Sequence, residues 1–107
     1  MKINMLAAKI GLTPSIKKYI ELKIGSLQKF MGRYEKQGEA AVFVEIARTT
    51  KHHKRGDVFY AEATLRLPKK TLRAEHENSD LRVAVDLVRD ALKRELKKYK
   101  EIDTKKR

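Results

Sequence analysis

The segment DVFYAEATLRL, residues 57–67, limits the fold most tightly because its side chains alternate strictly in character. One side carries Phe59, Ala61, Ala63, Leu65 and Leu67, and the other carries Val58, Tyr60, Glu62, Thr64 and Arg66. A period of two residues is typical of a β-strand that has one face in a core and the other in solvent. The segment therefore predicts a sheet that is covered on one side only.

Three further segments have strand character. Residues 2–8 alternate, and residues 40–48, AAVFVEIAR, are rich in β-branched residues. Residues 71–77, TLRAEHE, follow a turn at Pro68-Lys69-Lys70 and read as the last strand. With the segment described above, the chain has four predicted strands.

Two segments have the period of amphipathic helices. Thr13 followed by Pro14 is an N-cap with proline at the first helical position, and the apolar spacing predicts a helix over 14–31. Asn78-Ser79-Asp80 opens the second helix, with Asn78 or Ser79 as the predicted N-cap and an apolar face that reaches Tyr99.

The resulting order is β-α-β-β-β-α, which predicts an α+β, two-layer sandwich. Two helices packed on one face of a four-stranded sheet close a single core, and 107 residues suit one domain. The first two strands, joined through a helix, are expected to pair in parallel, and the others as antiparallel hairpins. We expect the domain to span residues 1–100, and residues 101–107 to form a basic tail that is too polar to fold alone.

The formal net charge of +12 indicates a polyanionic partner. RNA is favoured over a membrane, because no stretch approaches the roughly 20 apolar residues that span a bilayer and both helices are committed to the core. The N-terminus is not a secretory signal, and the absence of cysteine excludes disulfides and thiolate metal sites. We expect a cytoplasmic protein.

The last helix carries the strongest candidate RNA-binding surface. One flank of its apolar face holds Arg82, Arg89, Lys93, Lys97 and Lys100, and the far side holds Arg94 and Lys98. Cations on a rigid helix suit a phosphate backbone. The alternative is ordinary surface pairing, of Asp86 with Arg82 and Arg89 and of Asp90 with Arg94. The basic excess continues beyond those pairs, which favours RNA binding.

The first helix adds cations that can extend this surface. Lys17, Lys18 and Lys23 are the candidates, and the only acid in this predicted helix is Glu21. Three aromatic residues, Tyr19, Phe30 and Tyr99, can stack on RNA bases, but their helical spacing favours core packing.

The segment TTKHHKRGD, residues 49–57, reads as a basic hairpin loop, and Lys51, Lys54 and Arg55 are its candidate RNA contacts. A metal site is disfavoured, because His52 and His53 diverge on a hairpin and too few other ligands exist. A small enzyme that acts on nucleic acid through His52, His53 and Asp57 stays open as an alternative, although no catalytic motif frames them. We expect no enzyme, no cofactor and no small-molecule substrate.

Several segments together resemble the short ribosome hibernation promoting factor and ribosome-associated inhibitor family. They are LTPSIKKYIELKIGSLQKF, VEIARTTKHHKRGDVFYAEATLRLP, LRAE and DLRVAVDLVRDALKRELKKYK, and they cover nearly the whole chain. The last helix is the most specific part, with Asp80, Ala84-Val85-Asp86, Leu92, Arg94, Leu96, Lys98 and Lys100 in the family's order. Where the family often has an aromatic residue and a basic residue, this chain has Arg82 and Ala91.

The resemblance implies the β-α-β-β-β-α fold and binding to small-subunit ribosomal RNA in the channel between the subunits. Messenger and transfer RNA would be excluded by occlusion, without chemistry, and Arg94, Lys98 and Lys100 are the contacts that the motif carries over. Apart from the resemblance, we expect a monomer away from the ribosome, because the domain is so basic. A constitutive ribosomal or RNA-chaperone protein is the alternative of the same broad class.

Overall fold

The structure, a computed structural model, describes residues 1–32, 40–49 and 58–105. Its elements are β1 Lys2–Ala8, α1 Pro14–Gly25, the 3-10 helix η1 Ser26–Phe30, β2 Ala41–Arg48, β3 Phe59–Leu67, β4 Lys70–Asn78 and α3 Leu81–Lys105. The predicted order β-α-β-β-β-α is confirmed.

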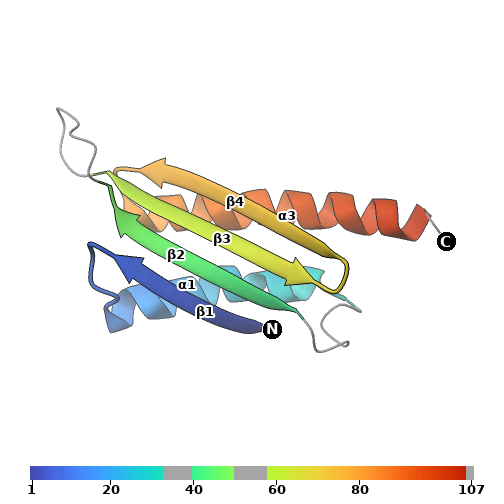
Figure 1. Ribbon diagram of the computed structural model, residues 1–107, viewed down its shortest axis with the longest axis horizontal. Coiled ribbons are helices and arrows are strands. Elements are labelled where there is room, and N and C mark those ends of the chain that lie inside the picture. Colours follow the sequence, from blue (N-terminus) through green and yellow to red (C-terminus); the bar gives the residue numbers. More distant parts are fainter. Residues whose placement is uncertain (33–39, 50–57, 106–107) are drawn as a thin grey trace.

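The four strands form one mixed sheet in the order β1-β2-β3-β4. β1 pairs with β2 in parallel, and the two hairpins β2–β3 and β3–β4 are antiparallel, as expected. Figure 1 shows α1 and α3 on the same side of this sheet, with the other side left open. The predicted two-layer α+β architecture is therefore confirmed.

The core lies between the sheet and the helices, where the alternation of the strands requires it. Val42, Val44 and Ile46 of β2 face the helices and are buried. On β3, Phe59 is partly buried, and the inward residues that follow it are fully in the core: Ala61, Ala63, Leu65 and Leu67. The helices contribute Ile20, Ile24, Leu27, Val88, Leu92 and Leu96, each with no exposed surface. Burial of these apolar side chains is the main force that holds the helices to the sheet.

The two helix starts differ in how well the sequence predicts them. Thr13 caps α1 as expected: its Oγ1 accepts a 3.2 Å hydrogen bond from the Ile16 backbone N–H, and Pro14 follows. The cap of α3 is Asp80, which accepts from the Arg82 N–H at 2.9 Å. Asn78 instead accepts from the Asp80 N–H. The prediction of Asn78 or Ser79 was therefore wrong, because Asn78 supports the capping residue rather than the helix itself.

Both helices also end differently from the prediction. The first α-helix ends at Gly25 and continues as η1 rather than running over 14–31. Gly25 and Ser26 are weak helix formers, which explains why the chain tightens there. At the other end of the chain, α3 continues to Lys105, so five residues of the expected tail are helical.

Candidate nucleic-acid interface

Cations from α3 meet α1 and η1 along the line where the helices pack together. Residues three and four apart on a helix share a flank, and the flank that carries Arg82, Arg89, Lys93 and Lys100 turns toward the first helical segment. Each of these four side chains contacts a group from residues 15–30, as described below. The structure therefore brings these four cations of α3 against the first helical segment, where Lys23 is the one candidate cation of α1 that joins them.

At the start of this line, Arg82 lies over the ring of Tyr19. Its guanidinium carbon is 5.3 Å from the ring centroid, and its Nη2 donates a 2.8 Å hydrogen bond to Ser15 Oγ. Lys23 Nζ lies 5.7 Å from the same centroid. Attraction between a cation and an aromatic ring holds both charges close to the helix junction.

Tyr19 is fixed by Asp86. The Tyr19 hydroxyl donates a 2.7 Å hydrogen bond to Asp86 Oδ1, and Lys23 Nζ is 3.9 Å from the same oxygen. Burial and the hydrogen bond to Asp86 raise the pKa of Tyr19 to about 12. The phenol is therefore protonated at neutral pH and remains a hydrogen-bond donor.

Arg89 lies in the middle of the line. Its Nε donates a 3.1 Å hydrogen bond to Ser26 Oγ, and its Nη1 donates to Asp90 Oδ1 at 2.9 Å. The surface pairs expected from spacing differ from those observed, because Asp86 turns to Tyr19 and Lys23 while Asp90 pairs with Arg89. Ser15 and Ser26 were missed by sequence analysis, since a serine in a helix gives no signal until its neighbour is known.

At the far end, Phe30 organises three lysines. Lys93 Nζ lies 4.7 Å and Lys97 Nζ 5.7 Å from the centroid of its ring. Lys100 Nζ donates a 3.0 Å hydrogen bond to the Phe30 carbonyl oxygen. A lysine is a favourable partner for a carbonyl at the C-terminal end of a helical segment.

We call this row of cations the basic seam: Arg82, Lys23, Arg89, Lys93, Lys97 and Lys100. Eighteen helical steps separate Arg82 from Lys100, so the seam is about 27 Å long. Among the residues that the structure describes, Asp86 and Asp90 are the acids that contact it. Lys23 and Arg89 contact these carboxylates, whereas the described contacts of the other four cations are with rings, a hydroxyl and a carbonyl, which carry no negative charge. A row of cations with this excess of positive charge is suited to binding phosphate.

The remaining predicted cations lie elsewhere. Lys17 and Lys18 are exposed on α1, and Arg94 and Lys98 are exposed on α3. Lys98 lines a pocket of about 750 Å³ together with Lys69 of the β3–β4 turn and Lys70 at the start of β4, two cations that sequence analysis did not select. Lys51, His52, His53, Lys54 and Arg55 lie outside the described residues, as does Asp57.

The aromatic residues serve the core, as their spacing favours. Tyr19, Phe30 and Tyr99 are half-buried and pack against the buried cluster. The ring faces of Tyr19 and Phe30 are also occupied by the cations of the seam.

Two absences hold for the described part of the chain. Within residues 1–32, 40–49 and 58–105, no three histidine, cysteine or acidic side chains are grouped so that they could hold a metal ion. Among the helices that the structure describes, none is long and apolar enough to cross a membrane.

A family model described as Sigma 54 modulation protein / S30EA ribosomal protein matches residues 3–103. The chain is 33% identical over 100 residues to the ribosome hibernation promotion factor of Lactococcus lactis subsp. cremoris, covering 94% of this chain and 50% of that protein. It is 33% identical over 91 residues to the Staphylococcus aureus protein of the same name, covering 85% of this chain and 44% of that one. The chain therefore spans about half the length of the curated relatives it matches.

Two solved structures have the same fold. The Protein Y N-terminal domain of Thermus thermophilus superposes with a TM-score of 0.76 at 26% identity, covering 92% of this chain and 99% of that one. A ribosomal subunit interface protein from Coxiella burnetii superposes with a TM-score of 0.73 at 24% identity, covering 94% and 99%. Both support the order and layering of the elements described above.

Proposed function

This chain belongs to the Sigma 54 modulation protein / S30EA ribosomal protein family, and we propose that it binds small-subunit ribosomal RNA through the basic seam and holds the ribosome inactive. The family description and the names of the relatives concern ribosome-associated proteins and no enzyme, in agreement with the sequence-based expectation.

The single observation that carries the proposal is the basic seam itself. Six cations from two helices form one row, and each is positioned by a neighbour within the fold rather than left on a free side chain. Positioned cations lose less conformational freedom when they bind, so a rigid row suits a phosphate backbone of fixed shape.

Occlusion is the mechanism that fits this surface. A domain that covers the RNA of the decoding channel excludes messenger and transfer RNA by occupying their place, and this needs neither a catalytic group nor a cofactor. We propose that the protein acts in the cytoplasm as a monomer, because like-charged copies repel one another until RNA neutralises the seam.

Co-sedimentation of the purified protein with isolated small subunits and with assembled ribosomes tests the proposal. We expect saturable binding that weakens as salt rises and that is lost when messenger and transfer RNA already occupy the ribosome. A constitutive ribosomal protein would bind whether or not those RNAs were present. Failure to bind either particle would reject the proposed function for this chain.

A further inference from the structure

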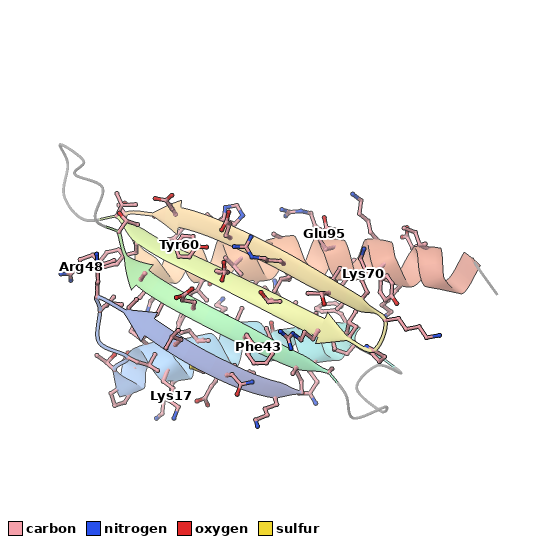
Figure 2. The ribbon with its side chains drawn as sticks, viewed as in Figure 1. Lys17, Phe43, Arg48, Tyr60, Lys70 and Glu95 are labelled. Carbon is pink, nitrogen blue, oxygen red and sulfur yellow. The ribbon has the colours of Figure 1, made fainter. Side chains whose placement is uncertain are left out.

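The open face of the sheet, opposite the helices, differs in charge from the rest of the molecule. Figure 2 shows Phe43 and Tyr60 on this face. Its side chains come from the outward positions of all four strands and include Lys2, Arg66, Arg73, Glu45, Glu62, Glu75 and Glu77. With three cations and four carboxylates, the face is slightly acidic in a chain whose formal net charge is +12.

Three glutamates form one row across this face. Glu45 of β2 is the register partner of Glu62 of β3, and Glu62 is the partner of Glu75 of β4. Leu6 of β1 completes the row beside Glu45. Neighbouring strands lie only about 4.8 Å apart, and like charges directly opposite one another destabilise a sheet.

Two of the three carboxylates have stabilising partners among the described residues, and the third has none there. Arg73 Nη2 donates hydrogen bonds to both Glu62 and Glu75. The Tyr60 hydroxyl lies 2.8 Å from Glu62 Oε2 and 2.6 Å from Glu75 Oε2, so it donates to either one. These bonds, first that of Tyr60 and then that of Arg73, lower the pKa of Glu75. Glu45 has no hydrogen-bond or ion-pair partner among the described residues.

A pocket adjoins the Glu45 carboxylate. It has a volume of about 240 Å³, and its outward-facing lining consists of Asn4, Leu6, Phe43, Glu45, Glu62 and Thr64. Leu6 is 62% exposed and Phe43 is 41% exposed, so apolar surface meets solvent beside two glutamates. Phe43 already accepts one guanidinium, that of Arg66, at 4.9 Å from its ring centroid.

We propose that this pocket binds a lysine or arginine side chain from an extended, cation-rich protein segment. The long stem of such a side chain can pack on Leu6 and Phe43 while its charged head reaches Glu45 and Glu62. The site lies on the opposite side of the domain from the basic seam, so one molecule can hold RNA and a basic protein segment together. RNA on the seam would also lower the net positive charge that repels such a partner.

The experiment uses the full chain, labelled with 15N, and follows its backbone amide signals by NMR. The probe is a blocked decapeptide of alternating arginine and valine, and the control is the same peptide with glutamate for arginine. We expect saturable shifts at the amides of β1 and β2 around Leu6 and Glu45, and no response to the acidic peptide. The variant E45Q should weaken binding by about tenfold, because a charge-assisted hydrogen bond is lost.

A matched variant, E21Q, removes the same charge from α1 and should bind the peptide as the wild type does. Equal peptide affinity in E45Q and the wild type, shifts centred on α3, or equal binding of the acidic peptide would each overturn the proposal. Shifts at the same amides on self-association would identify a second copy as the occupant and would also overturn it. Binding of E45Q to protein-free small-subunit RNA should be unchanged, so failure of this site is distinguishable from failure of the seam.

Discussion

The Tyr19 hydroxyl donates a 2.7 Å hydrogen bond to Asp86 Oδ1 across a separation of 67 positions in the sequence. This bond links α1 to α3 within the row of cations. From helical spacing alone, Asp86 would be expected to pair with Arg82 and Arg89 of its own helix. Asp86 also lies 3.9 Å from Lys23 Nζ. A single acid therefore connects the two helices that together form the basic seam.

Replacing Tyr19 with phenylalanine tests this connection. The Y19F variant should lose about 1 kcal/mol of unfolding free energy, because a half-buried hydrogen bond is removed while the ring stays in place. Urea denaturation of Y19F, D86N and the double variant forms a cycle. The two single effects should not add, and a fully additive result would show that the hydrogen bond contributes nothing to stability.

The raised pKa of Tyr19 predicts how stability depends on alkaline pH. Burial and the hydrogen bond to Asp86 raise the pKa of the Tyr19 phenol from its ordinary value of 10 to about 12 in the folded chain. The stabilisation that the protonated phenol gives to the folded state is therefore complete below pH 10 and is lost as the pH rises from 10 to 12. The free energy of unfolding, measured by urea denaturation across this window, should fall more steeply in the wild type than in Y19F. Tyr60, whose pKa is also raised, is present in both proteins, so parallel curves would contradict the prediction.

Charge reversal separates the seam from the outer flank of α3. The variant K93E/K97E should weaken binding to small-subunit RNA by about 100-fold near 0.1 M salt, since two phosphate contacts are lost and repulsion is added. The variant R94E/K98E makes the same change in charge on the same helix, outside the seam, and should cost less than about tenfold. Filter binding or fluorescence anisotropy would measure both. Equal losses of RNA affinity in the two variants would indicate that RNA contacts both flanks of α3, as the family motif implies for Arg94 and Lys98.

The salt dependence of RNA binding should reflect the number of cations that contact phosphate. With six seam cations in contact, affinity should fall by about 10³ between roughly 50 and 200 mM salt, if folded RNA follows the behaviour of duplex DNA. Neutralising two of them in K93A/K97A should reduce the slope of log affinity against log salt by about two. An unchanged slope would mean that these lysines do not touch phosphate.

Gly25 and Gly32 should respond to alanine in opposite directions. A Cβ at Gly25 would lie 3.8 Å from Ile3 Cδ1, an ordinary contact, and the backbone there is helical. We expect G25A to raise the unfolding free energy by about 0.5–1 kcal/mol. Gly32 has a φ of +55°, a backbone conformation that is unfavourable for alanine. We therefore expect G32A to lower the free energy of unfolding. Thermal denaturation of both variants measures the contrast, and a loss of stability in G25A would contradict the first expectation.

The layers of the fold could be predicted from the sequence because the spacing of apolar residues in each helix and strand indicates which face is buried. The alternation through Phe59 and Leu67 and the Thr13-Pro14 start of α1 are local signals, and the structure confirms both. The break at Gly25 was not predicted, because weak helix formers only permit such a change and packing decides it. The capping role of Asp80 was missed for a similar reason, since three adjacent residues could each have served.

The candidate site could be predicted only in part. The flank formed by Arg82, Arg89 and Lys93 follows from helical spacing alone. Its partners Ser15, Ser26 and Phe30 do not, because which flank of α3 meets which flank of α1 depends on how both helices lie on the sheet. The row of glutamates could not be predicted for a similar reason, because Glu45 and Glu62 become neighbours only once the β2–β3 register is fixed.

The basic seam takes Lys23 from α1, which is made early, and its other five cations from α3, which is made last among the described elements (Figure 1). β1 likewise has no strand to pair with until β2 has been synthesised. A nascent chain whose α3 is still inside the exit tunnel therefore has neither the closed core nor the row of cations. The ribosome that translates this protein is thus exposed to the assembled seam only after the last helix has emerged and packed, when synthesis of the domain is already over.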